Sequence, residues 1–244
     1  MTSNLSTSLK TENFETKKQK SIDSGIIYIV YKLDVLLFEK HSNLLLFGET
    51  FVEKNRNNCK IIINEKEYEI KRAINVKEFR EYGINKDDKI LGAILKGGNI
   101  EYMSFMFLDC TSLIEVDLSL FNSQNIKNVY GMFSNCRNLA KVNFSSFNTK
   151  NVVNMGSMFY SCRSLTKLDL SSFDTRNVID MEWMFGFCEG LNKLDLSSFS
   201  TQNVKEMGRM FDFCESQIQV GRKTFEKIKN GLELTKHKIN IIEI

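Results

Sequence analysis

The apolar positions of this chain recur with a step of 26 residues from Asn99 to Cys214. Each step holds a Met-Phe pair, a Cys three residues after the Phe, and then a run in which apolar and polar residues alternate. A fixed period of this size, free of insertions, is typical of repeat units that stack and bury one face against their neighbours. The cysteines in step are Cys110, Cys136, Cys162, Cys188 and Cys214, and the pairs begin at Met106, Met132, Met158, Met184 and Met210.

Each repeat divides into two halves with different periodicity. In residues 165–173, Leu168 and Leu170 alternate with polar residues, which predicts a short strand with its leucines turned inward. In residues 178–188 the apolar residues fall at i, i+3, i+7 and i+10, the spacing of one helix face. A strand and a helical segment per unit predict an α/β solenoid of the leucine-rich-repeat type, with parallel strands about 4.8 Å apart.

The repeats divide the chain into four predicted regions. Residues 1–24 are rich in Ser, Thr and Lys, which predicts a disordered tail. Residues 25–98 are predicted to form an N-terminal segment and cap, because a stacked array exposes an apolar end unless something covers it. The repeat array occupies residues 99–216, and residues 217–244, where the pattern decays, are predicted to form a C-terminal cap.

The N-terminal segment contains several strand signals. Gly25–Tyr31 is apolar and too short to span a membrane, so we expect a strand or a buried helical turn rather than an internal signal. An apolar core is missing before it, so no secretory signal is expected. Further strands are predicted at 44–47 and 89–95, a hairpin at Cys59–Ile63 and Glu67–Ile70, and a short helix at Val76–Tyr82.

One repeat unit carries a specific motif, Met-Phe-x-x-Cys-x-x-Leu-x-x-Leu-Asp-Leu-Ser-Ser-Phe-x-Thr-x-Asn-Val. It resembles the BspA-like leucine-rich-repeat surface proteins, whose repeat is also known from mycoplasma lipoprotein-associated proteins and some protists. Residues 162–185 match nearly letter for letter, and the resemblance covers about half of the chain. It implies a repeat scaffold used in adhesion or protein binding, without catalytic residues. It also implies a surface or secreted location, whereas the missing signal favours an intracellular one.

Composition and cysteine usage narrow the possible functions. The chain is 42% hydrophobic and 26% charged, as in folded proteins, and its net charge of +3 gives no support for a nucleic-acid partner. Five of the six cysteines share one repeat position, where we expect reduced thiols acting as small apolar fillers. A metal-binding ladder would need CxxC or CxxH spacing, which the repeats lack. No metal or cofactor is therefore expected.

Catalytic groups are also missing from the pattern. The only histidines, His41 and His237, lie outside the repeats, and no phosphate-binding glycine motif is present, so no enzyme activity is expected. A column of Asp117, Asn143, Asp169 and Asp195 runs along the predicted strand face beside a column of Lys residues. A cation site is one interpretation. We favour a solvated face with offsetting charges, because calcium needs six to eight oxygen ligands.

Departures from the repeat point to a binding surface. Trp183 and Tyr160 lie opposite the apolar stripes of their units and should be close together, while Phe187 and Phe213 add a second aromatic column. Exposed aromatic residues anchor protein interfaces, so these four residues are the predicted partner-binding site. Alternatively, the rings fold back over the helical layer, or the segments are irregular turns. The predicted function is a non-catalytic module for protein–protein or adhesive interaction, with an intracellular structural scaffold as the alternative.

Overall fold

The structure is mostly β-sheet. It is a computed structural model that describes residues 25–34, 37–38, 42–214, 217–222, 226 and 240–243. The predicted tail, both histidines and most of the predicted C-terminal cap lie outside these residues. Two short helices are defined, α3 (Glu49–Asn55) and the 3-10 helix η1 (Val76–Tyr82). The strands are β1 (Ile26–Lys32), β2 (Asn43–Leu45), β3 (Cys59–Ile63), β4 (Lys66–Glu69), β5 (Ala73–Asn75), β6 (Ile90–Gly97), β7 (Leu113–Asp117), β8 (Lys141–Asn143), β9 (Lys193–Leu196), β10 (Gln217–Val220) and β11 (Asn240–Glu243).

The N-terminal elements confirm most of the predicted local structure. β1, the β3–β4 hairpin, η1 and β6 all lie where the sequence places them. The hairpin turns through Asn64 and Glu65, whose φ angles of 47° and 68° are those of a type I′ turn. η1 begins after Asn75, whose side-chain oxygen accepts a hydrogen bond from the Lys77 N–H. Polar and turn residues therefore set the element boundaries, as capping and turn chemistry predict.

A mixed six-stranded sheet joins the N-terminal elements to the first repeats. Its strand order is β4-β3-β6-β1-β7-β8, with β1 antiparallel to both β6 and β7 and with β7 parallel to β8. Tyr31 of β1 is fully buried, and its hydroxyl donates a 2.6 Å hydrogen bond to the Leu46 carbonyl. Because β1 pairs with β7, the first strand of the repeats is not an open edge that could recruit another chain.

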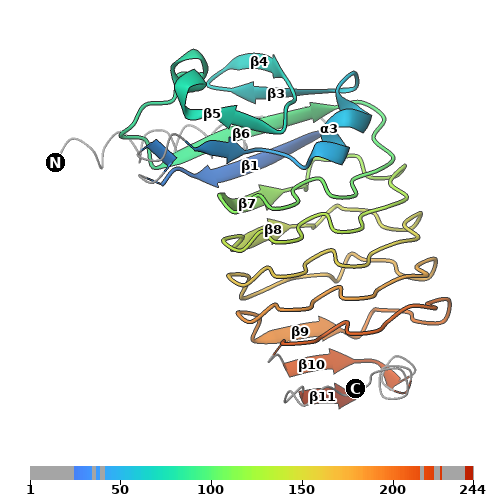
Figure 1. Ribbon diagram of the computed structural model, residues 1–244. Coiled ribbons are helices and arrows are strands. Elements are labelled where there is room, and N and C mark those ends of the chain that lie inside the picture. Colours follow the sequence, from blue (N-terminus) through green and yellow to red (C-terminus); the bar gives the residue numbers. More distant parts are fainter. Residues whose placement is uncertain are drawn as a thin grey trace.

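The repeat units stack one below another beneath this sheet (Figure 1). Parallel bridges join each unit to the next along one side of the stack. On the other side, β9, β10 and β11 form a parallel sheet. The bridged residues, each 26 positions after the last, are Tyr102, Asn128, Asn154, Asp180 and Glu206.

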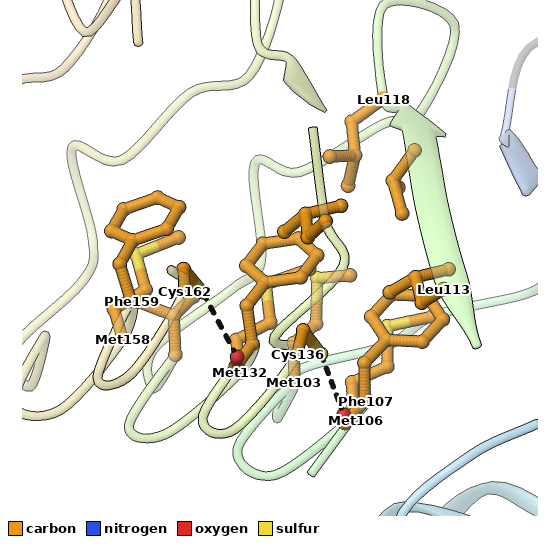
Figure 2. Close-up of a cluster of buried hydrophobic side chains, with 14 of the residues drawn as sticks. Met103, Met106, Phe107, Leu113, Leu118, Met132, Cys136, Met158, Phe159 and Cys162 are labelled. Atoms are coloured by element: carbon orange, nitrogen blue, oxygen red, sulfur yellow. Dashed lines mark hydrogen bonds between the residues drawn. The ribbon is translucent and has the colours of Figure 1, made fainter. Parts of the chain in front are cut away.

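The core of the stack is a column of parallel rings. Phe133 and Phe159 lie 5.7 Å apart with an angle of 10° between their planes, and the next two steps repeat the 5.7 Å spacing at 2° and 3°. Methionines, leucines and cysteines fill the space around the rings (Figure 2). Such burial of large apolar side chains is the main favourable term in folding. The five rings are Phe107, Phe133, Phe159, Phe185 and Phe211.

The predicted α/β solenoid is wrong. The described repeats contain no helix; residues 178–188 form successive turns instead. Trp183 and Phe187 have φ angles of 57° and 58°, and left-handed residues of this kind interrupt a right-handed helix. Residues 165–170, predicted as a strand, are also not assigned as one. The predicted region boundaries at 98/99 and 216/217 stay predictions.

Candidate functional site

Two backbone positions in each repeat unit have left-handed geometry. Their φ angles lie between 53° and 61°. Glycine, Asn and Asp adopt this geometry readily, whereas bulky residues seldom do. The first position is occupied in successive units by Phe105, Gly131, Ser157, Trp183 and Arg209, and the second by Asp109, Asn135, Ser161, Phe187 and Phe213.

The structure brings all four predicted partner-binding residues together. Tyr160 packs edge-on against Trp183 and Phe187, with ring centroids 5.6 and 5.4 Å away. Phe187 stacks on Phe213 at 4.4 Å and lies 6.2 Å from Trp183 in a nearly parallel orientation. The predicted proximity of Trp183 and Tyr160 is confirmed. We call Tyr160, Trp183, Phe187 and Phe213 the aromatic edge.

The aromatic edge rests on the backbone of its own turns. A Cβ atom added to Gly186 would lie 2.7 Å from Cε3 of Trp183 and 3.2 Å from Cδ2 of Tyr160. Tyr160, Trp183 and Phe187 are half-buried, whereas Phe213 is 42% exposed. The rings therefore fold back over the turns in part, as one of the alternatives predicted, and still present apolar surface to solvent.

Three further residues of these turns were missed from the sequence. The Arg209 guanidinium lies 5.1 Å from the Trp183 ring centroid, within cation–π range. Phe105 and Tyr130 pack edge to face at 5.2 Å on the earlier turns. A sequence signal does exist, because an aromatic residue is followed 26 positions later by a glycine that leaves room for its ring. The pairs are Phe105 with Gly131, Tyr130 with Gly156 and Tyr160 with Gly186.

Acidic side chains lie beside the aromatic edge. Glu182 directly precedes Trp183 and is exposed. Asp180 and Glu206 face each other across a bridge between neighbouring units. Asp180 accepts a 2.9 Å hydrogen bond from the Asn154 amide. Within the described part of the chain, these three carboxylates form no ion pair with a Lys or Arg.

The carboxylate column on the strand face caps turns. Asp169 and Asp195 each accept a 2.9 Å hydrogen bond from the backbone N–H two residues further on. Hydrogen bonds from the backbone and side chain of Ser171 lower the pKa of Asp169, and hydrogen bonds from the side chain and backbone of Ser197 lower the pKa of Asp195. No group of three or more potential metal ligands occurs among the described residues. The arrangement gives Asp169 and Asp195 a structural role at the turns that follow them.

The cysteines form a second structural column. All six are buried, which confirms the predicted packing of the five in the repeats. Cys136 and Cys162 donate their thiols to backbone carbonyls 29 residues earlier, at 3.0 and 3.2 Å (Figure 2). Burial raises the pKa of Cys162 well above its usual range and that of Cys59 to about 12. A nucleophilic role would need the thiolate form, which burial disfavours here.

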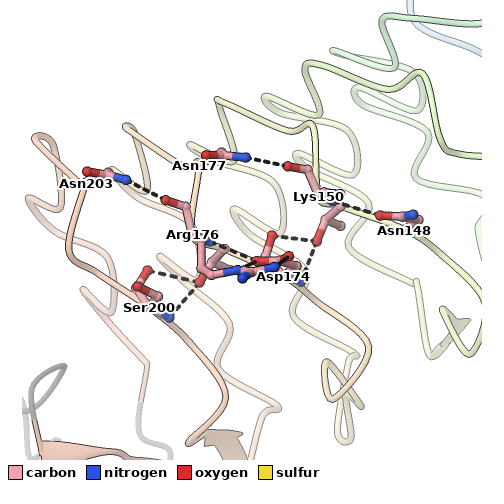
Figure 3. Close-up of polar contacts among 9 residues, drawn as sticks. Asn148, Lys150, Asp174, Arg176, Asn177, Ser200 and Asn203 are labelled. Atoms are coloured by element: carbon pink, nitrogen blue, oxygen red, sulfur yellow. Dashed lines mark hydrogen bonds and ion pairs between the residues drawn. The ribbon is translucent and has the colours of Figure 1, made fainter.

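Another edge of the stack is a polar ladder. Asn177 donates its side-chain amide to the Lys150 carbonyl at 2.8 Å, and Asn203 repeats this contact with Arg176 at 2.7 Å (Figure 3). Arg176 pairs with Asp174 at 2.6 Å and lowers the pKa of that carboxyl group. A shallow hollow runs along this edge. The Asn side-chain amides bind backbone carbonyls of the preceding unit and so hold the units together, whereas the ion pair lies within one unit.

Comparison with known proteins places the repeats in a family. The sequence model of a family described as "Mycoplasma protein of unknown function, DUF285" matches residues 94–165 and 130–229, which together span more than half of the chain. No curated protein and no solved structure matches. Within the described residues, every helix is too short or too polar to cross a membrane.

Proposed function

The chain belongs to the DUF285 family of Mycoplasma proteins of unknown function, and we propose that it is a non-catalytic repeat module that binds a protein partner. The observation that carries the proposal is the aromatic edge, which presents four packed rings along three successive repeat units. Tryptophan and tyrosine are enriched among the residues that dominate binding energy at protein interfaces.

The backbone supports a binding role for these rings. Trp183, Phe187 and Phe213 occupy left-handed positions, where a residue other than glycine costs about 1–2 kcal/mol. Ser157 and Ser161 occupy the same positions one unit earlier. Bulky aromatic residues therefore do not lower the conformational energy of the backbone at these positions. Strained residues concentrate at functional sites, where the side chain itself is needed.

Two finer proposals follow from the sequence motif and from the stack. The motif at residues 162–185 supports kinship with the BspA-like leucine-rich-repeat surface proteins, and with it an adhesive contact. The continuous ring column from Phe107 to Phe211 supports the alternative of an intracellular structural scaffold, because it builds a rigid body without a partner. Protease treatment of intact source cells distinguishes them, since a surface adhesin is digested and an internal scaffold is protected.

Affinity capture from native cell extract tests the binding module. The test variant carries Trp183→Ser and Phe187→Ser, which restore the residues found one unit earlier and therefore suit the backbone. The control variant carries Val153→Ser and Ile179→Ser, which remove apolar side chains that are 41% and 37% exposed on the bridged side. Circular dichroism confirms that both variants fold.

Capture by wild type and by the control variant, with loss in the aromatic variant, is the expected result. A partner retained equally by all three proteins would exclude the aromatic edge as the binding site. A full chain that captures nothing at any extract concentration would contradict the binding module and favour the scaffold.

A further inference from the structure

We infer that the aromatic edge receives a basic peptide segment, whose arginine or lysine side chain takes the place that Arg209 holds on Trp183. This inference rests on the proposed binding function and adds the chemical class of the partner. The exchange is non-covalent, because one cation replaces another over the same aromatic surface.

The intramolecular contact shows what this surface accepts. Arg209 is exposed, and its guanidinium lies 5.1 Å from the Trp183 ring centroid. A second cation caps an exposed ring nearer the N-terminus, where the Lys54 ammonium lies 4.9 Å from the centroid of Tyr102, a residue that is 42% exposed. Aromatic faces on this protein therefore attract cations, as the ring quadrupole predicts.

The charges around the rings favour a basic partner. Asp180, Glu182 and Glu206 lie on the same two chain segments as Trp183 and Arg209, which are joined by the bridge between Asp180 and Glu206, and these three carboxylates form no ion pair within the described ranges. The cations of segments 179–187 and 204–211 are Lys205 and Arg209. An incoming cation therefore meets an excess of carboxylates. Arg209, once displaced, can turn to Glu182, whose carboxylate lies 3.8 Å from the Cβ position at the neighbouring Gly208. After the exchange the incoming cation lies on Trp183 and Arg209 pairs with Glu182.

The length of the surface favours a peptide over a small cation. The rings extend from Tyr160 to Phe213 across three successive units, and Phe213 is the most exposed of them. Arginine and lysine bury their aliphatic stems along apolar surface while keeping the charged group near water. A basic segment can therefore cover Phe187 and Phe213 while its cation reaches Trp183.

Trp183 is the only tryptophan in the chain, so tryptophan fluorescence, excited selectively over the seven tyrosines, reports on this site alone. We would titrate the full chain with a peptide of five Arg-Ser repeats and with the same peptide carrying citrulline, which keeps the shape of arginine and removes its charge. The expected result is a saturable change with the arginine peptide and none with citrulline. Arg209→Ala should tighten binding about two- to five-fold, because the internal competitor is lost.

Two further variants make the test specific. Arg137→Ala removes an exposed arginine away from Trp183 and should leave the affinity unchanged. Phe213→Ser, at an exposed ring, should weaken binding. Equal binding of the citrulline peptide, or an Arg209→Ala variant that binds no tighter, would overturn the inference. If the arginine peptide fails while the capture experiment succeeds, the binding function stands and the partner is not basic.

Discussion

Gly186→Ala tests the placement of the aromatic rings directly. The added Cβ would lie 2.7 Å from Cε3 of Trp183, closer than packed atoms approach, so the ring must shift. Crowding of this kind costs about 1–3 kcal/mol. Replacing glycine also stabilises the folded state by about 0.4–1 kcal/mol, through the entropy of the unfolded chain. We therefore expect Gly186→Ala to lower the free energy of unfolding by about 1 kcal/mol.

A double-mutant cycle isolates the ring contact. In a Trp183→Ser background the nearest remaining atom is Cδ2 of Tyr160 at 3.2 Å. Gly186→Ala should then be neutral or stabilising by up to about 1 kcal/mol, which gives a coupling energy of about 1 kcal/mol or more. Gly208→Ala is the matched control, because its added Cβ would meet nothing closer than 3.8 Å.

Urea unfolding gives the free energy of unfolding of wild type, the two single variants, the double variant and the Gly208→Ala control. Far-ultraviolet circular dichroism follows the transition, since tryptophan fluorescence is lost with Trp183. Equal denaturant slopes would show that the unfolded states are comparable. A coupling energy below about 0.3 kcal/mol would mean that the two sites act independently. That result would refute the placement of the Trp183 ring over Gly186, and with it the packing of the aromatic edge against the backbone.

Three other perturbations have defined outcomes. Phe173→Ala should cost about 3–5 kcal/mol in urea unfolding, because this ring is only 3% exposed, and a loss below about 0.5 kcal/mol would place it on the surface. Thr175→Val should cost about 1–3 kcal/mol, with exposed Ser171→Ala as control, because the buried Thr175 hydroxyl bonds both the N–H and the carbonyl of Ser200. The cysteines should resist a thiol reagent at pH 8 until urea unfolds the chain; rapid labelling of the native protein would contradict their burial. Burial raises the pKa of Cys59 from its usual 9.0 to about 12, so the unfolded chain loses that proton first and stability should fall as pH rises through this window.

The sequence predicted what depends on simple burial and on local turn chemistry. A strict period shows which residues share a column, so the buried Phe, Met and Cys columns follow from spacing alone. The Asn64-Glu65 turn and the Asn75 cap also obey local rules. These features need no knowledge of how distant segments meet.

The helix prediction failed because spacing does not define backbone geometry. Apolar residues three and four apart line one helix face, but they also line the inside of successive turns. The left-handed residues that distinguish the two cases include Trp183, Phe187 and Phe213, residue types that give no such signal. The strand of residues 165–170 failed for a related reason, since alternation predicts which side chains face inward without requiring a hydrogen-bonded ladder.

The sequence selected the residues of the candidate site but did not predict how far their side chains are buried. Departures from the repeat selected Tyr160, Trp183, Phe187 and Phe213, and the structure gathers them. Their half-buried state was not predicted, because it depends on how closely the rings lie against backbone without a side chain, as Trp183 and Tyr160 do at Gly186. Arg209 was missed because a cation over a ring needs no sequence motif.

The two left-handed positions in each unit have an evolutionary consequence. Their ten occupants in successive units differ in size, charge and polarity, yet none is Val, Ile or Thr, whose β-branching would clash most in that geometry. At these positions, from Phe105 to Phe187, the backbone N–H donates to a carbonyl of the next unit, so a new side chain leaves that bond in place. Asn135 adds a side-chain hydrogen bond to Asp109 of the preceding unit. The repeat therefore combines a constant backbone frame with an edge of varied side chains. Under the proposed binding function, exchanging these residues would change the partner while the fold stays the same.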